Sequence, residues 1–202
     1  MARTPRAVED RREQIIDAAM RVFSQKGFTR ATNKDIAHEA GITAGLIYHY
    51  FENKKAVLNA IIEGRSPLRL VRSLSPHVLA LPPDRFLRFL VPQVLAIVEE
   101  EKFVQLIRVF VSEAIHNPEM GRTIAETLDK VLNFLTDYFS SKMMSGELRQ
   151  GNATLAAQTF LGCVMGFVLR RQVLRDPTAL EYTHEQIAEV IVETLLKGLL
   201  PR

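Results

Sequence analysis

Residues 15–58 read IIDAAMRVFSQKGFTRATNKDIAHEAGITAGLIYHYFENKKAVL and contain short apolar segments separated by glycine- and threonine-containing breaks. In the first segment, expected to form a helix from Arg12 to Phe28, apolar residues recur three and four positions apart. This spacing is typical of a helix with one buried face. Gly27, near the end of the segment, is suited to the left-handed conformation in which helices often stop.

A tight turn is expected to join the next two helices. Thr32 is placed to cap a helix that contains Ile36 and Ala37. Residues 40–43, Ala-Gly-Ile-Thr, follow: the glycine permits a sharp turn, the isoleucine enters the core and the threonine caps a third helix. That helix, residues 44–51, is barely two turns long. Two short helices joined in this way form a helix-turn-helix.

The third helix is predicted to have an inward and an outward face. At 100° per residue Ile47 and Phe51 fall together and should face inward. Small residues near its beginning would let the helix enter a DNA major groove about 12 Å wide. Tyrosine and histidine further along can donate hydrogen bonds to phosphate oxygens, and Asn53 is placed to cap a fourth, lysine-led helix. The residues predicted to contact DNA are Thr32, Thr43, Ala44, Gly45, Leu46, Tyr48, His49, Tyr50 and Lys54.

Some of these residues have a purely structural alternative. Tyr48 and Tyr50 could be half-buried aromatics that pack on the fourth helix, and His49 could be a solvated surface residue. The apolar Ala44 and Leu46 favour contacts with thymine methyl groups over hydrogen-bonded readout of bases.

The whole stretch resembles the DNA-binding domain of the tetracycline-repressor (TetR) family, over about a quarter of the chain. The resemblance rests on the combined spacing of Phe23, Gly27, Thr32, Ile36-Ala37, Ala40-Gly41-Ile42-Thr43, Gly45, Tyr48, Tyr50-Phe51, Lys54 and Leu58. It implies a transcriptional regulator, typically a repressor, that binds a palindromic double-stranded DNA operator as a homodimer and responds to a small molecule. Asn33 stands where this family more often has an apolar residue, which leaves packing at the start of the second helix in doubt.

Helical spacing continues through the rest of the chain, and no repeat or low-complexity tract is visible. We expect an all-α fold of about nine helices, with a helix-turn-helix domain at residues 1–62 and a helical effector-binding and dimerisation domain at residues 63–202. Thr183 and Gln186 have the capping-box spacing that opens a last helix.

The family resemblance also implies an effector cavity among the middle helices, with no cofactor. Apolar and methionine side chains there, Met143 and Met144 among them, indicate a small apolar or aromatic effector. An ordinary hydrophobic core is the alternative for any single one of them. The candidate pocket residues are Phe103, Ile107, Phe110, Phe134, Tyr138 and Met165.

The last two long helices are predicted to form the dimer interface. Residues 155–168 are apolar all round the helix, and Gly162 and Gly166 would let another backbone approach closely. Pairs of such helices from two subunits would form a four-helix bundle about a two-fold axis. Closure of the core of a single chain is the alternative. The candidate interface residues are Leu155, Phe160, Gly162, Gly166, Ile187, Val190, Ile191 and Leu195.

Composition agrees with a DNA-binding protein of the cytoplasm. Residues 1–55 hold ten basic and seven acidic side chains, so their excess of three equals the net charge of the whole chain, +3. A polyanion is the expected partner of that part. The basic arm, Arg3 to Arg12, could contact DNA or remain a solvated tail. The single cysteine, Cys163, is expected in the core, and no secretory pattern is seen at the start.

Other classes of protein fit the sequence less well. Residues 152–169 lack charge but fall short of the roughly 20 apolar residues of a membrane span, so we expect a buried helix and no membrane partner. No nucleophile elbow, phosphate-binding glycine loop or zinc-protease motif occurs, which argues against an enzyme. A helical adaptor that binds only proteins would have no need of the aromatic and basic outward face. No metal site is expected from the scattered histidines.

Overall fold

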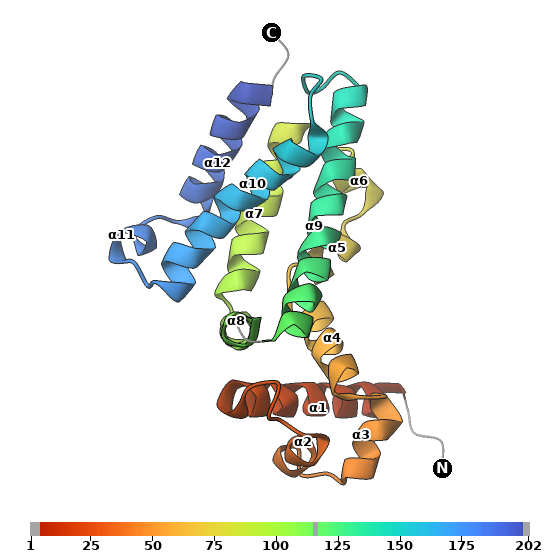
Figure 1. Ribbon diagram of the computed structural model, residues 1–202. Helices are drawn as coiled ribbons and strands as arrows, with labels where there is room; N and C mark the ends of the chain where they lie inside the picture. The colour runs from red at the N-terminus through yellow and green to blue at the C-terminus, as the bar shows by residue number, and fades with distance from the viewer. Residues whose placement is uncertain (1–4, 115–116, 200–202) are drawn as a thin grey trace. The chain divides into compact units, whose positions relative to one another are not determined.

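A computed structural model describes residues 5–114 and 117–199, and these form helices without any strand (Figure 1). The all-α prediction is confirmed. Nine of the helices have seven residues or more, which matches the expected number, and three short helices and one π-helix are additional. The bounds are α1 Pro5–Lys26, α2 Asn33–Glu39, α3 Ala44–Tyr50, α4 Lys54–Arg65, α5 Leu68–Ser73, α6 Pro76–Leu79, α7 Pro83–Glu99, α8 Glu101–Ala114, α9 Pro118–Met144, α10 Ala153–Val168, the π-helix η1 Leu169–Val173, α11 Pro177–Leu180 and α12 His184–Leu199.

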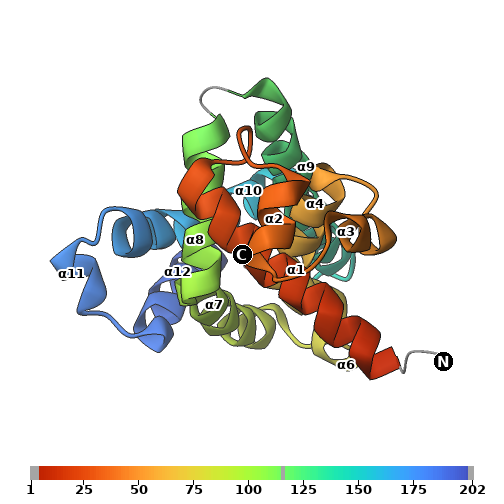
Figure 2. The same ribbon diagram turned by 90° about the horizontal axis from the view of Figure 1, so that it is seen from below.

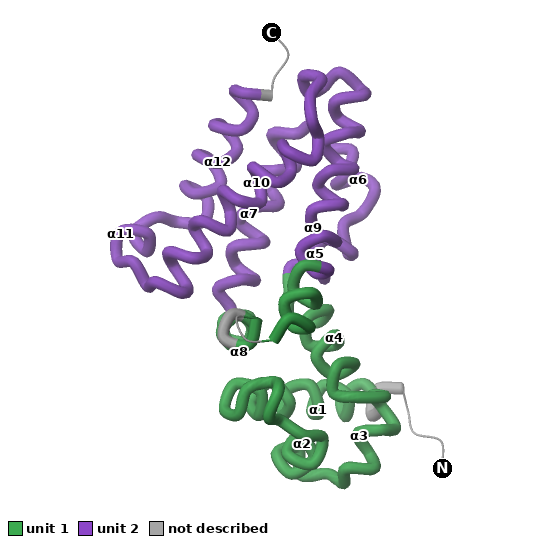
Figure 3. The backbone as a smooth tube through the Cα atoms, viewed as in Figure 1, with its two compact units in different colours: residues 1–66, 101–125 green, residues 67–100, 126–202 purple. Residues whose placement is uncertain are grey.

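The chain divides into two compact units (Figure 3). Unit 1 comprises residues 1–66 and 101–125, and unit 2 comprises residues 67–100 and 126–202. The sequence suggested a single cut near residue 62, but α8 and the start of α9 cluster with the N-terminal helices. This return of the chain to unit 1 left no signal in the local sequence pattern.

The core of unit 1 is built from the inward faces of its N-terminal helices, and α1, α2, α3 and α4 are seen grouped together in Figure 2. Phe23 of α1 is fully buried and meets Phe28 edge-on, with ring centroids 5.2 Å apart. Ile36 of α2 and Ile61 of α4 are likewise buried. The first helix begins at Pro5 rather than at Arg12, so the segment expected as a basic arm is helical as far as it is described. Arg3 lies outside the described residues.

Helix α8 is held to α1 and α4 in unit 1 by polar contacts as well as packing. Asp17 of α1 accepts hydrogen bonds from Arg65 at 2.9 Å and from Lys102 at 3.1 Å. At the other end of α8, Glu113 Oε2 accepts from the hydroxyl of Thr29 at 2.6 Å. Helix α8 therefore makes a carboxylate-centred contact near each of its ends, with α1 at the start and with the loop after α1 at the end.

Unit 2 is centred on α7, which packs extensively against α12 and also contacts α10. Phe86 of α7 is fully buried and stacks on Tyr138 of α9, with centroids 4.1 Å apart and ring planes 27° apart. Phe139 meets Phe160 of α10 edge-on at 6.3 Å. These aromatic contacts tie three of the long helices into one core.

A buried charged cluster joins α7 to the η1–α12 region of unit 2. Arg171 of the π-helix donates to the carboxylate of Glu99 and to the carbonyl oxygens of Ala179 and Tyr182, at 2.7 Å and 2.8 Å for the two carbonyls. His184 Nε2 lies 2.9 Å from the other oxygen of Glu99. Every partner of the buried guanidinium is thus an oxygen acceptor, as a buried charge requires.

The expectation that α10 is buried is wrong for the single chain. The apolar stretch from Ala153 to Val173 is long and apolar enough to cross a membrane by length and composition, yet only 28% of its most apolar window is buried. Cys163 is exposed rather than in the core. One face of this helix is therefore uncovered, and on its own this is weak evidence for a membrane span.

Candidate functional site

Helices α2 and α3 of unit 1 are joined by the tight turn that the sequence indicated. Gly41 has φ +63°, a conformation that favours glycine, and the amide of Ile42 donates to the carbonyl oxygen of Ala37 at 2.9 Å. Thr32 caps α2 in a capping box with Asp35: its hydroxyl accepts from the Asp35 amide at 3.2 Å, and the Asp35 carboxylate accepts from the Thr32 amide at 2.9 Å. The predicted cap is confirmed, and the turn fixes the direction of α3.

The faces of α3 match the angular prediction. Ile47 is fully buried and Phe51 is nearly so, whereas Gly45 and His49 are exposed. Tyr48 has 60% of its surface exposed, which is unusual for a large aromatic side chain. Ala44, Leu46 and Tyr50 are half-buried at the edges of this outward face. The helix therefore presents small and aromatic groups on one exposed surface.

The two predicted threonine caps differ in the structure. Thr43 occupies the N-cap position of α3 but its hydroxyl makes no capping hydrogen bond, so the prediction of a side-chain cap is wrong there. The Thr32 hydroxyl, in contrast, also donates to Asp35 at 2.7 Å. The Thr32 hydroxyl therefore acts as both donor and acceptor within the protein, so of the two threonines Thr43 has the hydroxyl that is more available to a ligand.

Lys54, predicted to contact a phosphate, has its ammonium group occupied within unit 1. It donates to the carbonyl oxygens of Phe28, Thr29 and Ala31, at 2.6, 3.2 and 2.8 Å. Its Nζ also lies 4.4 Å from the centroid of the Phe28 ring. Burial lowers the pKa of this ammonium from its ordinary value. Lys54 thus closes the loop that follows α1, and its contact with a DNA phosphate stays a prediction.

Two ion pairs hold charged side chains around the helix-turn-helix, whereas Lys34, a residue that the sequence reasoning missed, is unpaired among the described residues. Lys26 binds Asp35 at 2.6 Å, and Arg21 binds Glu39 at 2.6 Å. The hydrogen bonds from Lys26 and then Thr32 lower the pKa of Asp35 to about 2. Lys34, exposed near the start of α2, makes no ion pair with any residue in the described part of the chain. Its place in the first turn of α2, two residues after the cap, was the signal that could have identified it.

Asn33 bears out the doubt about packing at the start of α2. Its Oδ1 is buried and finds no hydrogen-bond partner among the described residues. A buried unpaired oxygen is destabilising by about 1–3 kcal/mol. An apolar residue at this position would avoid that cost.

A short exposed helix, positioned by a glycine turn on a three-helix core, defines a helix-turn-helix protein that reads DNA. Residues 15–61 match the family model "Bacterial regulatory proteins, tetR family". Residues 85–198, more than half of the chain, match "AefR-like transcriptional repressor, C-terminal domain". The chain belongs to the TetR family of transcriptional regulators, and it is a DNA-binding regulator rather than an enzyme.

Known relatives agree over nearly the full length. The transcriptional regulator SrpR of Pseudomonas putida is 30% identical over 83% of this chain and 76% of its own length. A TetR-family regulator from Mesorhizobium loti is 21% identical with a TM-score of 0.75, covering 98% of this chain and 100% of the other. The SmeT–triclosan complex has a TM-score of 0.75 at 22% identity, and the match covers 95% of this chain and 92% of the other. The two structures support the fold alone.

The predicted effector residues are divided between the two units. Phe103 and Phe110 are buried in unit 1, and Ile107 beside them is half-buried. Met165 is exposed on α10. Only the remaining two, Phe134 and Tyr138, line a cavity of about 380 Å³ in unit 2. The predicted set therefore mixes core residues of unit 1 with cavity and surface residues of unit 2.

The predicted dimer residues separate into buried and exposed groups. Phe160, Ile187 and Ile191 are buried within the single chain, and Leu195 is half-buried. The exposed members are Leu155, Gly162, Gly166 and Val190, with Leu155 at 58% and Val190 at 60% exposure. No Cβ added at either glycine would meet another atom within 4 Å.

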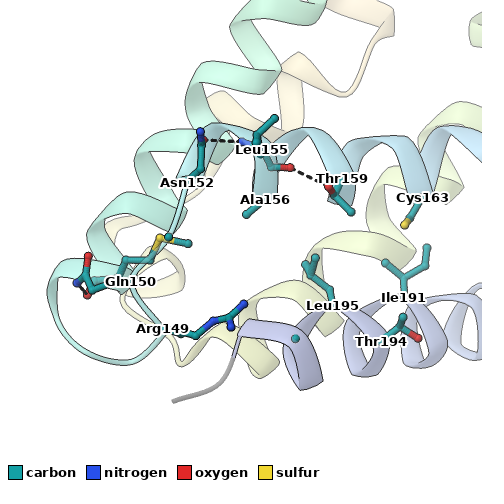
Figure 4. Close-up of a pocket in the computed structure, with 13 residues that line it drawn as sticks. Arg149, Gln150, Asn152, Leu155, Ala156, Thr159, Cys163, Ile191, Thr194 and Leu195 are labelled. Carbon is teal, nitrogen blue, oxygen red and sulfur yellow. Dashed lines mark hydrogen bonds between the residues drawn. The ribbon is translucent and has the colours of Figure 1, made fainter. Parts of the chain in front are cut away.

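Helices α10 and α12 of unit 2 enclose a groove of about 400 Å³ on this exposed side (Figure 4). Leu155, Thr159 and Cys163 line it from α10, while Ile191 and Leu195 line it from α12. The lining is mostly apolar, and Arg149 adds a positive charge at one end. Surface of this kind is typical of a protein–protein contact.

Proposed function

We propose that the chain is a ligand-responsive repressor that acts in the cytoplasm as a homodimer on a palindromic operator. The observation that carries the DNA-binding part is the exposed face of α3, on which Tyr48 and His49 stand over a buried Ile47. Ala44 and Leu46 would contact thymine methyl groups, and Tyr48, His49 and Tyr50 would reach phosphates or base edges. Thr43 and Gly45 would allow close approach to the backbone. Lys34 would contact the phosphates beside α2.

The uncovered face of α10 and α12 supports the homodimer. Leu155 of α10 and Val190 of α12 are large apolar side chains that remain exposed, and Gly162 and Gly166 of α10 are exposed as well. Burial of such a face against its two-fold copy would form a four-helix bundle and remove apolar surface from water. In such a dimer the two copies of α3 would enter successive major grooves about one helical turn apart.

Ligand response rests on the family and on the cavity of unit 2. A relative of the same fold is described as a complex with triclosan, a small aromatic compound. In one conformation of the dimer the two helix-turn-helix units would be wrongly spaced for the operator. An effector that binds this conformation more tightly would shift the population away from the operator-bound state. A repressor of this kind would release its operator when the effector accumulates.

In vitro selection of random duplex DNA tests the function, with affinity then measured against salt concentration. We expect a palindromic consensus, bound with a steep salt dependence because several phosphates are neutralised. A selection that yields no consensus, with weak and sequence-independent binding, would overturn the proposal of a specific operator. A consensus without two-fold symmetry would overturn the homodimeric arrangement.

A further inference from the structure

A cavity of about 380 Å³ in unit 2 lies beside α6 and the second half of α9. This volume is in the range of small-molecule sites. Its apolar wall comes from Leu79, Ala80 and the ring of Phe134, and Tyr138, which is 6% exposed with Lys142 Nζ 5.7 Å from its ring centroid, also lines it. Tyr138 is fixed in place because it stacks on Phe86. A flat apolar or aromatic group therefore has a rigid surface on which to pack.

The positive charge at this cavity is already neutralised. Lys142 is nearly buried, with 8% of its side chain exposed, and binds Glu147 Oε1 at 2.9 Å. The same carboxylate oxygen accepts from the Ser145 hydroxyl at 3.0 Å. The hydrogen bond from Lys142 is the main cause that holds the pKa of Glu147 below its ordinary value, so this side chain stays ionised. The ammonium group is thus engaged with its own carboxylate.

One carboxylate of the lining is left without a partner. Asp137 forms no ion pair or hydrogen bond with any residue that the structure describes, and it is exposed at the cavity. With Lys142 and Glu147 cancelling, the lining carries a net charge of −1 from Asp137. Burial, followed by the charges of Glu147 and Asp84, raises the pKa of the Tyr138 hydroxyl, so this hydroxyl stays neutral.

We infer that this cavity binds an organic monocation with an apolar or aromatic body. The body would pack on Phe134 and Tyr138, and the ammonium group would lie against the Asp137 carboxylate. Aromatic faces attract cations as well as apolar groups, so both parts of such a ligand find a matching surface. An anion would instead have to displace Glu147 from Lys142 and approach Asp137.

This inference deepens the proposed ligand response and, for its regulatory effect, rests on that proposed function. Binding itself is tested first, on the full-length protein without DNA. Three probes share one skeleton: 3-phenylpropylamine as the cation, 3-phenylpropanol as the neutral compound and 3-phenylpropionate as the anion. Calorimetric titration should give the tightest binding for the amine. Equal or tighter binding of the propionate, or no binding of the amine, would overturn the inference.

A pair of variants on α9 locates the site. Asp137→Asn keeps the shape of the side chain and removes its charge, and should weaken binding of the amine about tenfold while leaving binding of the neutral alcohol unchanged. The control is Asp129→Asn, because Asp129 is an exposed aspartate of the same helix that does not line the cavity. This variant should bind both the amine and the alcohol as wild type does. Equal weakening by both variants, or by neither, would overturn the assignment to this cavity.

Operator binding then separates this inference from the proposed function. In one outcome the amine binds and Asp137→Asn weakens that binding, but addition of the amine does not change the affinity of the protein for its operator. The ligand site in the cavity is then supported, and its role in regulation is overturned. If the amine releases the operator equally from wild type and Asp137→Asn, ligand response stands and the cavity assignment is overturned.

Discussion

The ammonium group of Lys54 lies above the ring of Phe28 while it donates a hydrogen bond of 2.6 Å to the carbonyl oxygen of the same residue. The carbonyls of Thr29 and Ala31 accept from it as well, so one side chain of α4 holds the loop between α1 and α2. The position of the helix-turn-helix on α1 depends on this loop. A lysine in the sequence motif is therefore part of the framework of the DNA-binding unit.

Replacing Lys54 by methionine should destabilise the protein by about 2 kcal/mol, because several carbonyl oxygens lose their donor. Lys55→Met is the matched control: its ammonium pairs with Glu119 at 3.2 Å between two exposed side chains, and its loss should cost less than about 0.5 kcal/mol. Urea denaturation of both variants measures the difference. Equal stability of the two would show that the Lys54 contacts contribute nothing to the fold.

Gly27 and Gly41 should differ in their tolerance of alanine. Both have positive φ, +77° and +63°, so alanine at either costs about 1–2 kcal/mol in backbone conformation. A Cβ at Gly27 would also collide with Oε1 of Glu113, whereas none at Gly41 meets any atom within 4 Å. Thermal unfolding should therefore give Gly27→Ala a free energy of unfolding about 1–3 kcal/mol lower than that of Gly41→Ala. Equal losses in the two variants would mean that Glu113 moves aside freely.

Tyr48→Ala should weaken operator binding by about 1–3 kcal/mol without changing the unfolding midpoint, because this side chain is 60% exposed. Tyr182→Ala removes another exposed tyrosine, 51% exposed, from unit 2 and should leave operator affinity unchanged. Tyr48→Phe then isolates the hydroxyl. Fluorescence anisotropy with labelled operator measures all three variants, and unchanged affinity of Tyr48→Ala would remove this residue from the interface.

The local parts of the fold were predictable from the sequence because each carries a local signal. Thr32, Asn53 and Thr183 cap their helices through hydrogen bonds to residues three positions ahead, and the buried Ile47 follows from the period of the helix. Contacts between distant segments left no such signal. The Lys54 bonds span more than 20 residues, and the link from Thr29 to Glu113 spans 84.

Burial on α10 and α12 was harder to predict for a related reason. An apolar residue has the same hydrophobicity whether it faces the core of its own chain or a partner. Packing against α7 decides that Ile187 and Ile191 are buried while Val190 between them is not. In the same way, Arg171 gave no hint of burial, because its acceptors on Glu99, Ala179 and Tyr182 are brought together only by the tertiary fold.

Stability at acid pH should depend on Glu99. Burial works to raise the pKa of this carboxyl, but the hydrogen bonds and positive charges of Arg171 and His184 outweigh it and hold the pKa below the ordinary 4.5. A lowered pKa in the folded state contributes stability that is present above 4.5 and is lost as the pH falls through the folded-state value. Denaturation of Glu99→Gln should therefore show a shallower loss of stability with acid than wild type. Glu181→Gln, an exposed residue without an ion pair among the described residues, should follow wild type, and a Glu99→Gln curve parallel to wild type would contradict the linkage.

Val190→Glu should dissociate the proposed homodimer without unfolding either subunit. The side chain is 60% exposed in the single chain, so a charge there is compatible with the monomer, whereas two glutamates near a two-fold axis would repel one another. Leu128→Glu provides the control, because Leu128 is exposed on α9 and belongs to neither α10 nor α12. Sedimentation velocity should find monomers only for Val190→Glu, and operator affinity should fall with dimerisation. A Val190→Glu protein that sediments as a dimer at micromolar concentration would move the interface away from α12.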